Sequence, residues 1–112
     1  MLHTVIFDKR SPCWKGNPEY NKMFINCQRR YASDLLRARG HLVLNEVYDM
    51  LGIPRTIYAM TEGWVDIPDK KGDHPIVSFE CEKTLDDGRI KITFKTMGDI
   101  RQKLRKYYNW TE

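Results

Sequence analysis

Residues 17–52 read NPEYNKMFINCQRRYASDLLRARGHLVLNEVYDMLG, and this stretch carries the signals of two successive helices. Asn17 is a residue type favoured just before a helix, and Pro18 is tolerated in the first turn, where an N–H would have no partner. Gly40 is the residue type that most often ends a helix, because it adopts positive φ without strain. We therefore expect one long helix over about residues 18–39 and a second over about residues 42–51.

The first helix is expected to be apolar on one face and basic on the other. Apolar side chains recur at helical spacing and predict the face that packs on the core: Tyr20, Met23, Phe24, Cys27, Tyr31, Leu35 and Ala38. Polar and basic side chains are expected on the opposite face: Lys22, Asn26, Arg29, Arg30, Ser33 and Arg37. The prediction is a helix with a basic outer stripe.

Residues 76–95 predict a β-hairpin, because apolar and polar residues alternate on both sides of a turn. The alternating apolar residues are Val77, Phe79 and Cys81 before the turn, and Ile90, Ile92 and Phe94 after it. The pair Asp87-Gly88 suits a tight hairpin connection. Cross-strand ion pairs are expected between two acidic and three basic residues: Glu80 and Glu82 with Arg89, Lys91 and Lys95.

The remaining segments complete an α+β pattern. Short strands are expected at residues 4–7 and 64–67, and a helical turn over residues 56–62. Asp99 is expected to cap a last helix with one apolar stripe, made of Ile100, Leu104, Tyr107 and Tyr108. We predict an α+β fold with two or three N-terminal helices, a small antiparallel sheet with a hairpin at about 76–95, and a C-terminal helix. Residues 1–112 are expected to form a single domain.

Composition places the chain among folded globular proteins. Its 112 residues are 41% hydrophobic and 12% aromatic, and no apolar run is long enough to cross a membrane. The N-terminal residues lack the basic-then-apolar pattern of a secretory signal, so we expect a cytoplasmic protein. The net charge is +4 over residues 1–60 and −2 over residues 61–98. This polarity suits an anionic partner, whether nucleic acid or an acidic protein surface, and is equally compatible with a solvated surface.

Neither a metal site nor an enzyme active site is predicted. Three cysteines and three histidines are present, but no two of them have the short spacing of a structural zinc site. A zinc site built from His3, Cys13 and a strand residue stays an alternative. The sequence contains no nucleophile elbow, phosphate-binding glycine loop or metalloprotease motif. We expect no catalytic residues, cofactor or metal.

A DNA-binding alternative rests on residues 44–62. The segment around Gly52 has apolar residues on both sides of a turn glycine, as in a helix-turn-helix, and Arg55 would lie close to the DNA. Tyr48 stands where the crossing of two helices calls for a small residue. The second helix, over residues 56–62, has no Arg, Lys, Asn or Gln to read bases. The alternative is therefore a DNA-binding regulator with a degenerate motif.

The run from Phe24 to Thr56, with Gly63-Trp64-Val65 after it, resembles a small uncharacterised domain family common in phages and prophages. The likeness covers about residues 20–70 and is most specific in GHLVLNEVYDMLGIPRT, residues 40–56. The resemblance implies a phage gene product that acts inside a bacterial cell. It transfers no catalytic residues, because none are established for the family.

These observations lead to an expected function of binding and inhibiting, or modulating, a host protein or nucleoprotein complex. Small phage proteins without catalytic motifs often act in this way, as inhibitors of CRISPR nucleases do. The residues expected to contact the partner are Lys22, Arg29, Arg30 and Arg37 on the first helix, with Trp14 and Arg55 nearby. A minor virion or assembly protein, which would self-associate, is a further alternative. Nucleic acid stays an alternative partner, either under the DNA-binding alternative or through the basic stripe of the first helix.

Overall fold

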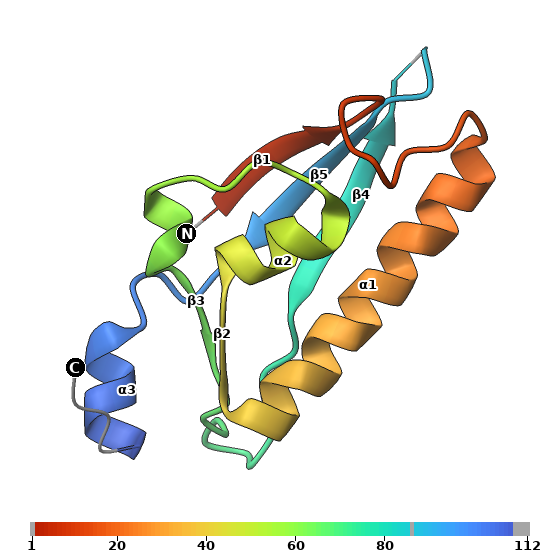
Figure 1. Cartoon of the computed structure of the whole chain (residues 1–112). Coiled ribbons are helices and arrows are strands. Elements are labelled where there is room, and N and C mark those ends of the chain that lie inside the picture. Colours follow the sequence, from red (N-terminus) through yellow and green to blue (C-terminus); the bar gives the residue numbers. More distant parts are fainter. Residues whose placement is uncertain (1, 86, 109–112) are drawn as a thin grey trace.

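The computed structural model describes residues 2–85 and 87–108, with the side chains of Ser78, residues 80–84 and Tyr108 excepted. Its elements, in chain order, are β1 (Leu2–Phe7), α1 (Pro18–Arg39), β2 (His41–Val43), α2 (Leu44–Leu51), the 3₁₀ turn η1 (Tyr58–Met60), β3 (Gly63–Val65), β4 (Ser78–Thr84), β5 (Ile90–Lys95) and α3 (Arg101–Tyr108). The α+β fold, the hairpin formed by β4 and β5, and the C-terminal helix are confirmed (Figure 1).

The main sheet is antiparallel and has the strand order β1-β5-β4. Side chains alternate along its central strand: Ile90, Ile92 and Phe94 are fully buried, whereas Lys91 and Lys95 on the other face are exposed. Helices α1 and α2 cover the buried face, and Figure 1 shows α1 running along the β4 side of the sheet. This is the usual antiparallel arrangement of one face on the core and one in water.

A second, two-stranded sheet lies between the helices and the C-terminal end of β5. Strands β2 and β3 pair antiparallel, with Leu42 opposite Trp64. Gly63 is required there, since a Cβ atom at this position would lie 2.0 Å from the carbonyl oxygen of Leu42. The Trp64 indole donates a hydrogen bond to the Lys95 carbonyl at 3.0 Å, which attaches this small sheet to β5.

The capping residues in the sequence correctly predicted most of the helix ends. The Asn17 side chain accepts hydrogen bonds from the backbone N–H groups of Glu19 and Tyr20, and Gly40 ends α1 with φ 88°. The second helix was predicted to begin at about residue 42, but residues 41–43 form β2 because they pair with β3. The helical turn predicted over residues 56–62 is the shorter η1.

The predicted core face of α1 is wrong for most of its residues, although Phe24 and Leu35 do pack against the core. The buried residues of the helix are Asn21, Ile25, Ala32 and Leu36. The predicted face instead points largely to solvent, with Tyr20 45%, Met23 67% and Tyr31 55% exposed and Cys27 exposed as well. The helix carries two apolar stripes. The mainly aliphatic one, with Ile25, Ala32 and Leu36, packs against the core, and the one with the two tyrosines faces solvent. The amide of Asn21 is accommodated in the core because it bonds the Lys15 backbone in both directions, at 3.0 and 2.7 Å.

The closing helix α3 follows its predicted cap. The Asp99 side chain accepts a hydrogen bond from the Arg101 N–H at 3.0 Å, and Ile100 and Leu104 are buried against Val65. Tyr107, predicted to be in the same stripe, is exposed. The predicted ion pairs of Glu80 and Glu82 lie outside the described side chains. Among the helices that the structure describes, none has the length and apolarity to cross a membrane.

Candidate functional site

The basic side chains predicted as a solvent-facing stripe on α1 lie partly against the edge of β4. Arg29 donates a hydrogen bond to the Phe79 carbonyl at 3.3 Å, and the Ser33 hydroxyl accepts one from the Val77 N–H at 3.1 Å. Lys22 and Arg29 are half-buried, whereas Arg30 and Arg37 are exposed. Half of the predicted stripe therefore packs within the protein, while Arg30 and Arg37 reach the surface, Arg37 at 3.9 Å from the Asp66 carboxylate.

Trp14 and Arg55 do not join this stripe. Trp14, predicted as a partner contact, is half-buried and packs on Phe7, with the ring centroids 5.7 Å apart. Arg55 lies beyond α2 and forms an ion pair with Asp49, whose pKa is lowered by the hydrogen bond from Arg55. The six predicted contact residues thus do not form one site.

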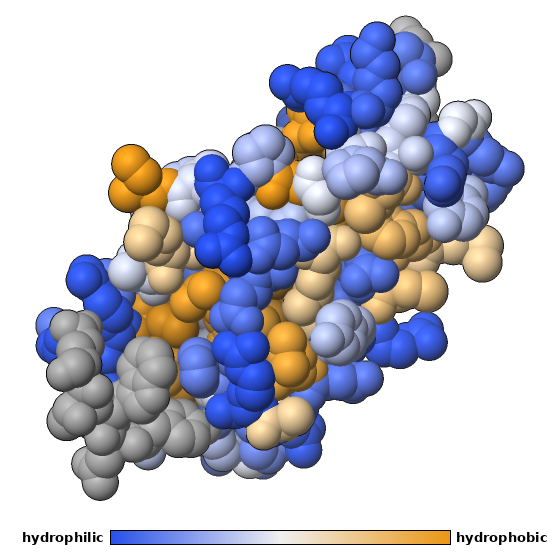
Figure 2. All heavy atoms as spheres, viewed as in Figure 1, coloured by the Kyte–Doolittle hydropathy of each residue, from blue (hydrophilic) through white to orange (hydrophobic). Residues whose placement is uncertain are grey.

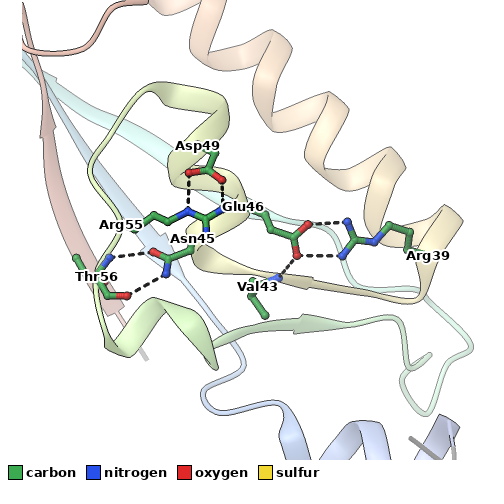
Figure 3. A network of polar contacts seen from close by, with 7 residues as sticks. All are labelled: Arg39, Val43, Asn45, Glu46, Asp49, Arg55 and Thr56. Atoms are coloured by element: carbon green, nitrogen blue, oxygen red, sulfur yellow. Dashed lines mark hydrogen bonds and ion pairs between the residues drawn. The ribbon is translucent and has the colours of Figure 1, made fainter. Parts of the chain in front are cut away.

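The helix-turn-helix alternative lacks its second helix. After α2 ends at Leu51, residues 53–57 have no regular structure, and η1 spans only three residues. The Asn45 amide holds this segment, donating to the Thr56 carbonyl at 2.9 Å and accepting from its N–H at 3.0 Å (Figure 3). A recognition helix that could enter a DNA groove is therefore not formed by residues 53–62.

The exposed apolar side of α1 is the largest feature that the sequence analysis misplaced. We call Tyr20, Met23, Cys27 and Tyr31 the outer stripe of α1. These residues follow one another at intervals of three or four, so they form a continuous row along one side of the helix. Figure 2 shows apolar residues reaching the surface along α1, between strongly polar ones. Large apolar and aromatic side chains grouped at the surface are typical of an interaction site.

A second cluster, mostly buried, joins five residues from four segments of the chain near the start of β1. The His3 imidazole lies 2.9 Å from the Glu62 carboxylate and stacks on the Tyr58 ring at a centroid distance of 4.2 Å. The Tyr58 hydroxyl lies 2.8 Å from that of Tyr48, and Thr96 donates to Glu62 at 3.3 Å. Burial, together with the hydrogen bond to Tyr58, raises the pKa of the Tyr48 phenol well above its ordinary value. Tyr48 therefore stays neutral and acts as a structural hydrogen-bonding group.

Sequence reasoning missed this cluster because its members share no motif spacing. His3 had been considered only as a zinc ligand with Cys13. In the part of the chain that the structure describes, no group of three or more His, Cys, Asp or Glu side chains could hold a metal ion. A histidine held by a carboxylate can move protons, but such a pair also occurs as a structural contact.

A cleft of about 280 Å³ lies beside β1. Asp8 and Arg10 lie at the cleft, and its walls come from two residues of β1 and four of the segment after α2: Val5, Ile6, Gly52, Ile53, Pro54 and Thr56. Arg10 bonds both carboxylate oxygens of Asp8 at 3.1 Å, and this bond lowers the pKa of Asp8. The cleft thus combines an apolar lining with one internally neutralised pair of charges.

Comparison with known proteins gives a family without an assigned activity. Residues 2–104 match the model of a family of unknown function, DUF6353, and the chain belongs to this family. No curated protein and no solved structure matches the chain.

Proposed function

We propose that this protein binds another protein through the outer stripe of α1 and has no catalytic activity of its own. The single observation that carries the proposal is the exposure of Tyr20, Met23 and Tyr31 on one side of a helix whose other side is anchored in the core. Tyrosine and methionine are well suited to such contacts, since they bury large apolar areas with adaptable geometry.

The helix presents this stripe in a fixed position. Ile25 and Leu36 are buried on the opposite side, Asn17 and Gly40 cap the two ends, and Arg39 is bonded to α2. With 22 residues, the helix is about 33 Å long. Because the helix is already ordered before binding, little conformational entropy is lost when a partner binds it in a groove, which favours affinity.

Charge indicates what kind of groove would fit. The α1 sequence contains five basic and two acidic side chains, and the exposed Arg30 and Arg37 lie beside the outer stripe. The partner surface we propose is an apolar groove with an acidic rim. In the setting implied by the sequence resemblance, this partner is a host protein complex in the bacterial cytoplasm. We propose that binding inhibits or modulates this host complex, and a complex that defends the bacterium against phages is one such target.

The test is a capture experiment with matched variants. The tagged protein is incubated with nuclease-treated bacterial lysate, and the retained proteins are identified by mass spectrometry. A double variant, Met23→Ser with Tyr31→Ser, should lose the captured complex. Tyr107→Ser, which changes an equally exposed tyrosine on α3, should retain it. If both variants capture the same proteins, the outer stripe is not the binding surface. If nuclease removes everything retained by the unchanged protein, the DNA-binding alternative is favoured.

A further inference from the structure

The two edges of the main sheet differ in how they are protected. The edge at β4 is covered by α1, whose Ser33 and Arg29 bond the outward backbone groups of Val77 and Phe79. Covering an edge in this way prevents another chain from pairing with it. The edge at β1, on the other side of the sheet, has no such cover.

Strand β1 also lacks the sequence features that usually block edge pairing. Its residues, LHTVIF, include no proline and no Lys, Arg, Asp or Glu, and its six-residue register with β5 is continuous, without a bulge. In the described part of the chain, the backbone hydrogen bonds of β1 all go to β5. Every second residue of β1 therefore directs an N–H and a C=O group outward with no backbone partner.

The cleft described above opens along this edge. Val5 and Ile6 line it at the C-terminal half of the strand. Neighbouring residues of a strand point to opposite faces, so a cleft lined by both of them and by no residue of β5 reaches around the edge of β1. Its other wall is held firmly. Asn45 makes its two hydrogen bonds to Thr56, and the Ser11 hydroxyl donates to the Leu51 carbonyl at 2.7 Å. The site is therefore formed before any partner arrives, which reduces the entropic cost of binding.

We propose that the free edge of β1 and this cleft bind an extended peptide segment of another protein, which adds to the sheet as a fourth strand beside β1. Backbone hydrogen bonds to β1 supply the affinity, and the apolar wall at Ile53 and Pro54 selects apolar side chains at alternate positions of the peptide. Asp8 and Arg10 neutralise each other, so the site has no net charge to attract nucleic acid.

The occupant is a single extended segment and not the β1 strand of a second copy. The wall formed by residues 52–56 runs beside the edge, and a second copy would bring the same wall with its own β1. Pairing of two copies would have to fit both walls beside the new strand pair, and the Asn45 and Ser11 hydrogen bonds hold each wall in place. A peptide without flanking structure has to fit beside one such wall only, and that wall already lines the cleft.

The test uses displayed peptides and two matched variants. A library of random short peptides is selected on the folded full chain, and the selected peptides are resynthesised with and without N-methyl groups on alternate backbone nitrogens. We expect apolar residues at alternate positions, and N-methylation should weaken the Kd by at least about tenfold by removing strand pairing.

Ile6→Glu places a charge at the cleft, and Leu2→Glu places one on the same sheet face outside it. Lys91 lies opposite Ile6 and Lys95 opposite Leu2, so both glutamates gain an opposite charge across the strand pair and both variants should fold. Ile6→Glu should weaken peptide binding at least about tenfold, and Leu2→Glu less than about twofold. The proposal is overturned if no peptide is selected, if N-methylation or Ile6→Glu has no effect, or if the free chain is a dimer that Ile6→Glu dissociates.

Discussion

Arg39, in the last turn of α1, and Glu46, in the first turn of α2, form a two-pronged ion pair with N–O distances of 2.6 and 2.9 Å (Figure 3). The same carboxylate accepts a hydrogen bond from the Val43 N–H at 3.3 Å, which satisfies a backbone group at the start of α2. One side chain therefore fixes both the beginning of α2 and its position against α1.

Replacement of this carboxylate should destabilise the fold measurably. Glu46→Gln removes the charge but retains the size of the side chain, and we expect the free energy of unfolding to fall by about 1 kcal/mol. Urea unfolding followed by circular dichroism measures the change. Asp49→Asn, which breaks the more exposed pair with Arg55, is the control and should have a smaller effect. Equal effects of the two changes would show that Glu46 has no special role.

The contribution of Glu46 should depend on pH in a defined direction. Burial alone would raise its pKa, but the hydrogen bonds from Arg39 and from the Val43 N–H outweigh burial and lower it. The stabilisation is therefore complete above the ordinary glutamate pKa and is lost as the pH falls through the lowered pKa of the folded state. The difference in unfolding free energy between the unchanged protein and Glu46→Gln should shrink between about pH 7 and about pH 3. A difference that stays constant over this range would contradict the assignment.

Asn45 should contribute more to the free energy of unfolding than its position on a short helix suggests. Its side chain is 3% exposed and makes both of its hydrogen bonds to the Thr56 backbone. Asn45→Ala leaves these two backbone groups without their partner, and we expect a loss of about 2 kcal/mol in unfolding free energy. Asn45→Asp retains only the acceptor. An intermediate loss on urea unfolding is expected for Asn45→Asp, whereas equal losses would mean that the donated bond carries the whole effect.

Cys27 should react with thiol reagents in the native protein. It is exposed on the outer stripe of α1, whereas Cys13 is half-buried in a loop that packs on the core. Addition of Ellman's reagent under native conditions should give a fast phase that Cys27→Ser removes and Cys13→Ser leaves in place. If Cys27→Ser leaves the fast phase unchanged, the outer stripe is covered in solution.

The features that were predicted correctly from the sequence depend on residues close to one another in the chain. Asn17 and Gly40 mark the ends of α1 through contacts within a few residues, and the alternation around Asp87-Gly88 predicted the hairpin in the same way. These signals need no knowledge of the rest of the chain. Both ends of α1, the hairpin and the fold class could therefore be predicted from short segments alone.

What the sequence could not predict depends on distant segments. Residues 41–43 form a strand because residues 63–65 pair with them, and the cleft at β1 exists because residues 52–56 lie beside it. The choice between the two stripes of α1 has the same origin. The core accepts Asn21 because Lys15 satisfies its amide, and apolarity alone favoured the aromatic stripe that faces solvent.

The assignment of the two faces of α1 can be tested directly by stability. Ile25→Ala and Leu36→Ala each remove a fully buried side chain, so each should lower the free energy of unfolding by about 2–5 kcal/mol. Met23→Ser and Tyr31→Ser change exposed side chains of the outer stripe and should alter it by less than about 0.5 kcal/mol. Urea unfolding of the four variants at one protein concentration measures both effects. A large loss for Met23→Ser or Tyr31→Ser would mean that the outer stripe is packed in the native protein. It would then not be available to the partner we propose, because a helix face already buried in the unbound state cannot form a new interface without first being uncovered.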